Sequence, residues 1–201
     1  MRILEELNGG ESILDLGCGN GELARRLARC GFTGRYLGLD SSRVLLQEVG
    51  KLPGNFAFAE ADLAAPGWEK MIDTPFDFVF CFAVLHHIPS RELRVEILDK
   101  VRNLLEPGGR FVHSEWQFLA SQKLKGRIQP WSEIGLSAAD VDPGDALLDW
   151  RSGGGGLRYV HAFDEAELDA LAKATRFRVR ETFRSDGESQ QLGLYQVWEA
   201  I

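Results

Sequence analysis

The sequence predicts an α/β fold in which a mostly parallel sheet carries helices on both of its faces. Short strand-like runs alternate with helix-like segments through residue 115, at spacings typical of β-α-β units. A glycine-rich turn follows the first run, and two further strand-like runs follow a helix-like segment near the C-terminus. The 201 residues include 44% hydrophobic and 26% charged side chains, as in an ordinary globular protein, so we expect one domain spanning residues 1–201.

Five short apolar runs in the first half are expected to form the parallel strands. They cover residues 12–16, 35–39, 55–60, 76–82 and 109–115. Three segments between them are expected to be helices, at residues 21–30, 42–50 and 90–105. The last helix carries apolar residues at helical spacing, namely Leu93, Ile97, Val101 and Leu104. Pro107, Gly108 and Gly109 should end this helix and turn the chain into the fifth strand.

The second half begins with a stretch of weak periodicity between Trp116 and Leu157. It contains prolines, tryptophans and the glycine run 153–156, which favour irregular structure. We therefore expect an insertion or a lid at about residues 116–157, placed after the fifth strand.

Regular structure is expected to resume at Asp164, which can cap a helix together with Glu167 in the reciprocal pattern of a capping box. Two strands, at 176–180 and 192–198, then close the sheet. Alternation along the first of them places three arginines on one face, at Arg176, Arg178 and Arg180.

Composition argues against several classes of protein. The longest apolar run, 76–88, is far shorter than the roughly 20 residues of a membrane-spanning helix. The N-terminal segment 1–6 is charged and helix-like, unlike a secretion signal. Three cysteines without C-x-x-C spacing predict neither a disulfide framework nor a metal site, so we expect a soluble, cytoplasmic protein. The net charge of −7 counts against unaided binding of nucleic acid.

The turn after the first strand, from Asp15 to Gly21, contains three glycines and leads into a helix. Glycines let a backbone turn sharply and approach a ligand closely, although a glycine turn without any chemical role explains such a pattern about as often. At the end of the second strand, Asp40 can accept hydrogen bonds from both ribose hydroxyls of a nucleotide. The dinucleotide fingerprint requires Gly or Ala where Glu22 stands, so an adenosyl ligand without phosphates fits better.

Three further segments complete a resemblance to class I S-adenosylmethionine-dependent methyltransferases. They are Glu60 to Leu63 after the third strand, Phe76 to Pro89 along the fourth, and Leu104 to Phe111 before the fifth. The resemblance is strong over residues 11–115. It implies a Rossmann-like, seven-stranded, mostly parallel sheet with an antiparallel last strand, S-adenosylmethionine as cofactor and S-adenosylhomocysteine as product.

The resemblance also implies which residues bind the cofactor. They are Asp15, Gly17, Cys18, Gly19, Gly21, Asp40, Ser41, Asp62, Leu63, Phe82 and Ala83. The first turn would face the methionine moiety, and Asp40 would face the ribose. Asp62 and the Leu63 amide would face the adenine, and the end of the fourth strand would lie beside the sulfur.

Methyl transfer needs alignment of acceptor and methyl group, whereas a general base is optional because some acceptors arrive ionised. His86 and His87 are expected at the mouth of the pocket, either as bases or as residues that cap or pack the loop before Pro89. His113, at the end of the fifth strand, allows the same two interpretations.

Residues 144–150, followed by 158–163, resemble the C-terminal half of the wobble-uridine carboxymethyl tRNA methyltransferase family. That family esterifies a carboxylate on a tRNA base, with a small activator protein as partner in eukaryotes. The resemblance implies that Arg158 and His161 hold the acceptor, and it makes these two residues and His86 the catalytic candidates. Asp149 departs from the pattern, because that family has Pro there.

Other acceptors and other classes stay open at this point. A small molecule, such as a quinone precursor or a carboxylic acid metabolite, is as good a candidate as tRNA. A noncatalytic S-adenosylmethionine-binding module and a nicotinamide-dependent oxidoreductase are further alternatives. Two basic groups, one at Lys123, Lys125 and Arg127 and one on the arginine strand, could contact phosphates or simply be solvated. The tryptophans Trp116, Trp131 and Trp150 could stack on a base or anchor the lid.

Overall fold

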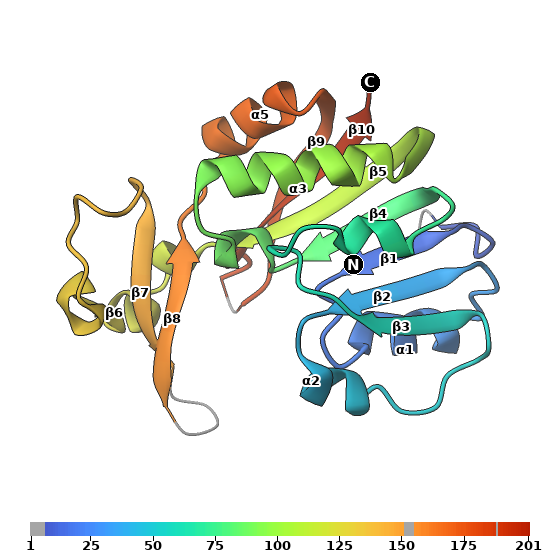
Figure 1. The fold of residues 1–201 in the computed structure, drawn as a ribbon, viewed down its shortest axis with the longest axis horizontal. Helices are drawn as coiled ribbons and strands as arrows, with labels where there is room; N and C mark the ends of the chain where they lie inside the picture. The colour runs from blue at the N-terminus through green and yellow to red at the C-terminus, as the bar shows by residue number, and fades with distance from the viewer. Residues whose placement is uncertain (1–6, 151–154, 188) are drawn as a thin grey trace.

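The computed structural model describes residues 7–150, 155–187 and 189–201, which form two sheets and the helices around them (Figure 1). The expected helix-like segment 1–6 and the first two glycines of the run 153–156 lie outside the described residues. The side chain of Trp150 lies outside them as well.

The larger sheet has seven strands in the order β3-β2-β1-β4-β5-β10-β9. They are β1 (Ile13–Leu16), β2 (Tyr36–Asp40), β3 (Phe56–Glu60), β4 (Phe76–Phe82), β5 (Leu105–Trp116), β9 (Phe177–Ser185) and β10 (Gly193–Ala200). The first five strands pair in parallel, whereas β10 runs antiparallel to both β5 and β9. The predicted fold class is therefore confirmed. Because these strands are parallel, the carboxyl ends of β1, β2 and β4 meet at one edge. The strand order reverses between β1 and β4, and such sheets bind ligands at this point of the edge.

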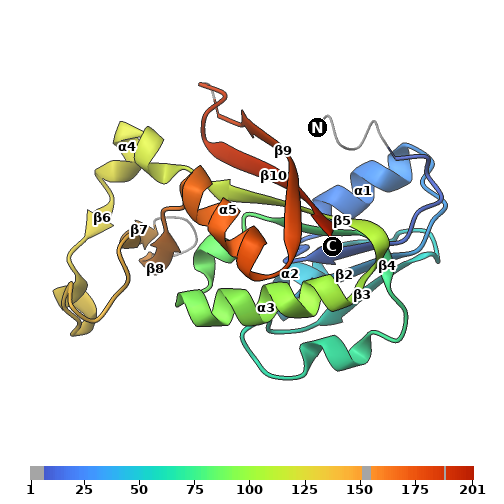
Figure 2. The same ribbon diagram turned by 90° about the horizontal axis from the view of Figure 1, so that it is seen from above.

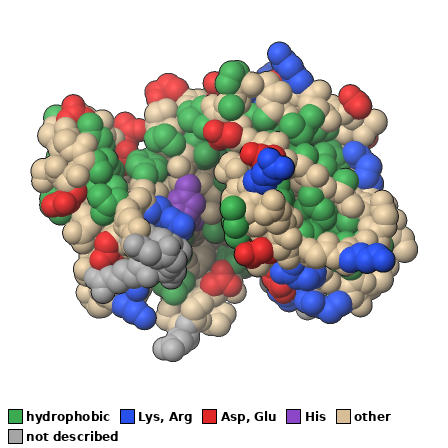
Figure 3. Space-filling model, turned by 60° about the horizontal axis from the view of Figure 1, so that its bottom comes forward, with side chains coloured by type: hydrophobic (Ala, Val, Ile, Leu, Met, Phe, Trp, Pro, Cys, Tyr) green, Lys and Arg blue, Asp and Glu red, His purple; other side chains and the backbone are tan. Residues whose placement is uncertain are grey.

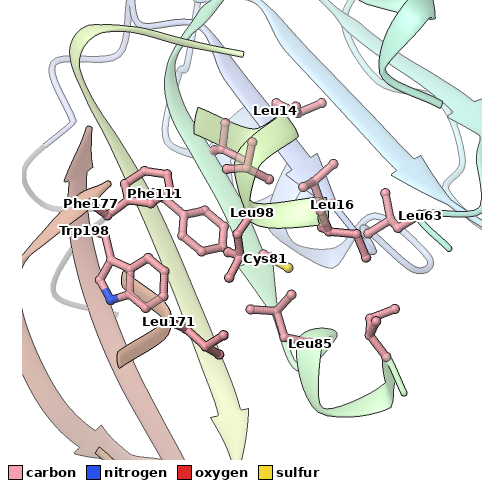
Figure 4. Close-up of a cluster of buried hydrophobic side chains, with 14 of the residues drawn as sticks. Leu14, Leu16, Leu63, Cys81, Leu85, Leu98, Phe111, Leu171, Phe177 and Trp198 are labelled. Carbon is pink, nitrogen blue, oxygen red and sulfur yellow. The ribbon is translucent and has the colours of Figure 1, made fainter. Parts of the chain in front are cut away.

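Helices cover both faces of this sheet (Figure 2). They are α1 (Glu22–Arg29), α2 (Arg43–Gln47), α3 (Arg91–Asn103) and α5 (Glu165–Ala174), with a short 3-10 helix, η2 (Trp68–Met71). α1 packs on one face through Ala24 and Leu27. α3, α5 and η2 pack on the other face, where Leu98 and Leu171 join Phe111 and Trp198 in the larger core (Figure 4). Burial of such side chains is the main stabilising contribution to the fold.

Polar side chains cap α5, as the sequence predicts, and α3. Asp164 accepts a hydrogen bond from the backbone N–H of Glu167 at 2.8 Å, which caps α5. The Glu167 carboxylate does not complete the capping box, because it lies 2.9 Å from Nε2 of His161 instead. At α3, the hydroxyl of Ser90 accepts from the N–H of Leu93 at 3.3 Å.

The stretch expected to be an insertion contains a second, antiparallel sheet, in the order β6-β7-β8. Its strands are β6 (Ile128–Gln129), β7 (Asp145–Trp150) and β8 (Gly156–His161). The same stretch contains the short helices η4 (Phe118–Ala120), α4 (Gln122–Lys125) and η5 (Trp131–Ile134). A further 3-10 helix, η3 (Leu85–His87), lies earlier in the chain, in the loop between β4 and α3. Ala146, Leu148 and Val160 pack on Phe118, with Trp116 against this small core. The expectation of weak regular structure here is wrong, and opening or closing of this sheet as a lid stays a prediction.

The arginine-rich closing strand, β9, is the edge strand of the larger sheet. Arg178 and Arg180 both form ion pairs with Glu199 of β10. Arg176 precedes the strand with φ 59°, so it does not share their face, contrary to expectation. The pairing with Glu199 supports a charged, solvated edge. Helices in the described part of the chain are all too short or too polar to span a bilayer.

Candidate active site

A cavity of about 710 Å³ lies at the carboxyl ends of β1, β2, β3 and β4, and β8 of the small sheet closes one side of it. This volume is in the range of small-molecule and cofactor sites. Eight of the residues predicted for the site line the cavity: Gly17, Gly19, Asp40, Ser41, Asp62, Leu63, Ala83 and Arg158. Figure 3 shows a hollow on this side of the molecule, with a histidine beside a Lys or Arg side chain on its wall.

The β1–α1 turn brings bare backbone to the cavity. Gly17 and Gly19 have φ angles of 74° and 55°, values that side chains disfavour. A Cβ on Gly17 would lie 2.2 Å from Cγ2 of Val84, so no side chain fits between the turn and the loop after β4. Gly21 begins α1 and lies outside the cavity lining, so its contact with the cofactor stays a prediction.

Asp40 is fixed by the two loops that it joins. One carboxylate oxygen accepts from the N–H of Gly19 and the other from the N–H of Ser42, both at 2.8 Å. A carboxylate has about four lone-pair positions, so this one can still accept hydrogen bonds from a ligand. Asp40 is therefore preorganised as an acceptor at the floor of the cavity.

The turn after β3 forms the next part of the wall. An oxygen of the Asp62 carboxylate accepts from the N–H of Ala64 at 2.9 Å, which holds the turn in one conformation. The Ala61 N–H donates to the carbonyl of Asp40 at 3.0 Å, and Leu63 is buried beneath. The wall thus presents one carboxylate and backbone amides beside apolar side chains.

Three predicted cofactor residues lie behind the cavity wall, not on it. Asp15 is buried and accepts from the hydroxyl of Tyr36, and its burial raises its pKa to about 7. Cys18 is buried under the glycine turn, and burial raises the pKa of its thiol. Phe82 packs with Phe80, their ring centroids 5.4 Å apart. These residues support the turn and the end of β4 from inside.

The two histidines after β4 differ sharply in position. His86 is 1% exposed, with Nδ1 at 3.0 Å from an oxygen of Glu115, and burial lowers its pKa to about 3. The prediction that His86 lies at the pocket mouth is wrong. His87 does line the cavity, and its Nδ1 donates to the carbonyl of Tyr159 at 3.0 Å. Burial and the neighbouring His86 lower the pKa of His87 to about 4, so both imidazoles are neutral at pH 7.

His161 is also buried and lies outside the cavity. Its Nδ1 is 2.6 Å from Asp145 and its Nε2 is 2.9 Å from Glu167, so both ring nitrogens already have partners. Burial opposes protonation, but the hydrogen bonds to Glu167 and Asp145 prevail and raise its pKa. The structure therefore places His161 outside the cavity lining with both ring nitrogens bound to carboxylates, whereas the sequence predicted a contact with the acceptor.

His161 belongs to a buried network that joins the small sheet to α3 and α5. Arg94 of α3 is 1% exposed and donates to the hydroxyl of Tyr159 at 2.7 Å. Its guanidinium lies 3.7 Å from Asp145 and 3.6 Å from Glu167. The Tyr159 hydroxyl in turn donates to Asp145 at 2.6 Å. The network holds β8 against α3 and thereby places residues 157–159 on the cavity wall.

Arg158 is the single Lys or Arg among the described residues that line the cavity. Partial burial lowers its pKa, but a guanidinium stays protonated at neutral pH. His113 does not line the cavity, because it is fully buried beside Glu115 and stacks on Phe111. The cavity lining therefore combines two carboxylates, at the carboxyl ends of β2 and β3, with one guanidinium from β8.

About half of the residues that line the cavity were not predicted from the sequence. These residues are Ser42, Leu45, Ala61, Ala64, Val84, Ile88, Pro89, Leu157 and Tyr159. Those that follow β2, β3 and β4 share the sheet edge with the predicted residues, so the strand assignment alone could have found them. Leu157 and Tyr159 depend on how β8 packs, for which the sequence carries no comparable signal.

Proteins with similar sequences are described as methyltransferases. Residues 1–182 match a family described as a methyltransferase domain. Trans-aconitate 2-methyltransferase of Pseudomonas aeruginosa is 32% identical over 161 residues, which are 79% of this chain and 52% of that protein. The chain thus spans about half the length of the curated relatives it matches first.

Solved structures share the fold. A methyltransferase of Methanosarcina mazei superposes with a TM-score of 0.75 at 20% identity, covering 100% of this chain and 97% of that one. The 1,6-didemethyltoxoflavin-N1-methyltransferase of Burkholderia thailandensis, solved with S-adenosylhomocysteine, has a TM-score of 0.65 at 18% identity, covering 95% and 71%. Because the family match covers most of the chain, this protein belongs to the methyltransferase domain family, as the sequence predicted.

Proposed function

We propose that this protein transfers the methyl group of S-adenosylmethionine to the carboxylate of a small-molecule acceptor. Family membership supports the reaction class, and the observation that supports the acceptor class is the placement of Arg158 in a cavity whose histidine is a very weak base.

The residues of the cavity fit the cofactor. Asp40 has spare acceptor positions for the ribose hydroxyls, and Asp62 with the Leu63 amide can pair with the adenine. The turn at Gly17 and Gly19 presents backbone without side chains to the cavity, and the missing Cβ of Gly17 lets Val84 pack against the turn. When bound, S-adenosylmethionine supplies a methyl group made electrophilic by the positive sulfur. The protein's part is to align the acceptor and exclude water.

Proton chemistry argues for an acceptor that is already ionised. His87 is the histidine of the described lining, and with a pKa of about 4 it removes protons poorly. A phenol or an ammonium acceptor would need a stronger base. A carboxylate does not: its oxygen forms the new bond to the methyl carbon as the carbon–sulfur bond breaks, and no proton leaves. Arg158 can hold the carboxylate through paired hydrogen bonds.

Charge favours a small molecule over tRNA. The chain carries a net charge of −7, and the arginines of β9 pair with carboxylates. Lys123 and Lys125 are exposed on α4, but two lysines neutralise few phosphates. A relative named for trans-aconitate, a carboxylic acid, agrees with this proposal. A small activator protein, a tRNA acceptor and a cytoplasmic location stay predictions.

The test is transfer of label from methyl-labelled S-adenosylmethionine. Separate reactions would contain trans-aconitate, a panel of aryl and alkyl carboxylates, a panel of phenols, and bulk tRNA. We expect label in one or more small carboxylates, released as methanol by mild alkali because methyl esters hydrolyse. Alkali-stable label in phenols, or label in tRNA alone, would contradict the proposal. Cofactor binding without transfer to any acceptor would instead indicate a noncatalytic binding module.

A further inference from the structure

A second cavity, of about 490 Å³, lies next to the candidate active site. We call it the η5 cavity, because η5 and the segment after it provide its apolar side through Trp131, Ile134 and Leu136. His87, Pro89 and Tyr159 line both cavities, so they form the boundary between them. A ligand that passes this boundary contacts both cavities at once.

The apolar side of the η5 cavity is built by a tight turn. The N–H of Leu136 donates to the carbonyl of Trp131 at 3.1 Å, and Gly135 closes the turn with φ 75°. Ile134 and Leu136 stay 48% and 41% exposed although they line a cavity. The Trp131 ring is tilted toward the Tyr159 ring, with centroids 6.5 Å apart. Apolar side chains left exposed in a concave site are typical of ligand contacts.

The charged side of the cavity is acidic. Asp140 and Asp142 are exposed, whereas the charge of Asp145 is compensated by Arg94. Among the described residues that line it there is no Lys or Arg, and His87 is neutral at pH 7. An anionic group would be repelled here, and a neutral or cationic one would not.

Resting on the proposed function, we infer that the η5 cavity binds the far end of the methyl acceptor. The acceptor class is then a carboxylic acid with an aromatic or branched apolar body that ends in a neutral or ammonium group. Its carboxylate reaches Arg158, and its body crosses the boundary at His87 and Tyr159 to pack on Trp131. A further anionic group at the far end, such as a phosphate, a sulfonate or a second carboxylate, is disfavoured by the two exposed aspartates.

Binding without turnover tests this inference. The full chain, saturated with S-adenosylhomocysteine, is titrated with ω-phenylalkanoates from phenylacetate to 6-phenylhexanoate and with straight-chain acids of matched length. We expect at least one phenyl acid to bind tenfold or more tightly than its match. A para-sulfonate on that ring should weaken binding at least tenfold, whereas a para-aminomethyl group should not.

Two single-residue variants test whether the phenyl preference arises in the η5 cavity. Trp131→Ala and, independently, Ile134→Asn should each reduce the phenyl preference at least fivefold and leave the affinity for S-adenosylhomocysteine unchanged. Leu119→Ala is the matched control, because Leu119 is 44% exposed in the same region but lies outside the cavity. A phenyl preference that survives both variants, or no preference at any chain length, overturns the inference.

The same titrations separate this inference from the proposed function. If straight-chain acids bind in a way that depends on Arg158, but no phenyl acid is preferred, the η5 inference is wrong and the proposed function still stands. If Arg158→Ala binds carboxylates as well as the wild type does, or if the protein does not bind S-adenosylhomocysteine, both the proposed function and the η5 inference are wrong.

Discussion

Arg94 of α3 and Asp145 of β7 form a buried ion pair 3.7 Å apart, with side chains 1% and 6% exposed. The pair joins α3 to the small sheet, and Tyr159 and His161 of β8 bond to the same carboxylate oxygen. A single guanidinium therefore compensates carboxylates from two elements, and the position of Arg158 on the cavity wall depends on it.

Replacement of Arg94 should be among the most destabilising substitutions in the chain. Arg94→Met leaves the carboxylates of Asp145 and Glu167 without their cation, and breaking a buried pair costs about 3–5 kcal/mol of unfolding free energy. Urea unfolding followed by circular dichroism measures this loss. Arg91→Met, at an exposed position in the same helix, is the control and should stay within about 0.5 kcal/mol of the wild type. Equal stability of the two variants would show that the network carries little energy.

Gly17→Ala should weaken cofactor binding by close contact with Val84. The new Cβ lies 2.2 Å from Cγ2 of Val84, and the φ of 74° is itself strained for alanine. We expect at least a tenfold weaker affinity for S-adenosylhomocysteine by calorimetry. The double variant Gly17→Ala/Val84→Ala removes the clash and should recover part of the affinity. No recovery would mean that the backbone strain, and not the contact, is responsible.

The buried carboxyl of Asp15 should make stability fall as pH rises. Burial raises its pKa to about 7 in the folded protein, above its value of roughly 4 in an unfolded chain. The folded state therefore holds a proton between these two pH values that the unfolded state releases, and this stabilisation is lost as pH rises toward 7. Asp15→Asn has no such proton. From pH 5 to pH 8 the wild type should lose roughly 1–3 kcal/mol more unfolding free energy than Asp15→Asn. Parallel pH profiles for the two proteins would contradict this assignment.

Arg158→Ala should spare the cofactor and affect the acceptor. Because Arg158 lies on β8 of the small sheet, whereas Asp40 and Asp62 lie at the ends of β2 and β3, the affinity for S-adenosylhomocysteine should stay within twofold of the wild type. Turnover with a carboxylate acceptor should fall at least tenfold, since a charge-assisted pair contributes about 1.5–3 kcal/mol. Lys125→Ala, an exposed position on α4, is the control. Equal losses of cofactor affinity and turnover would show that Arg158 does not act on the acceptor.

The larger sheet could be predicted because its strands carry strong local signals. The strand expected at 76–82 matches β4 at both ends, since a run buried on both faces has few polar interruptions. The small sheet could not be predicted in the same way. β6 has two residues, and β7 is a short run whose burial depends on contacts with Phe118 and Val160. Short strands stabilised by distant partners give no periodicity of their own.

The cofactor end of the candidate site was largely predictable, whereas the acceptor end was not. Asp40 and Asp62 follow strands, so the parallel topology alone brings them to one edge. His86 and His87 are neighbours in sequence, but the η3 turn directs one into the core and the other to the cavity. His161 was assigned to the acceptor because of its sequence surroundings, yet the packing of α5 and β7 occupies both its nitrogens. Such choices depend on tertiary contacts.

The affinity of the full chain for S-adenosylhomocysteine, compared with that of Asp40→Ala, tests the account most directly. Isothermal titration should show micromolar binding to the wild type and no heat with NAD. For Asp40→Ala we expect a loss of about 1–3 kcal/mol, the range for an unpaired buried hydrogen-bonding group, with Asp73→Ala as an exposed control. Binding of NAD in place of S-adenosylhomocysteine, or equal affinities of wild type and Asp40→Ala, would contradict the assignment of this cavity as the cofactor site.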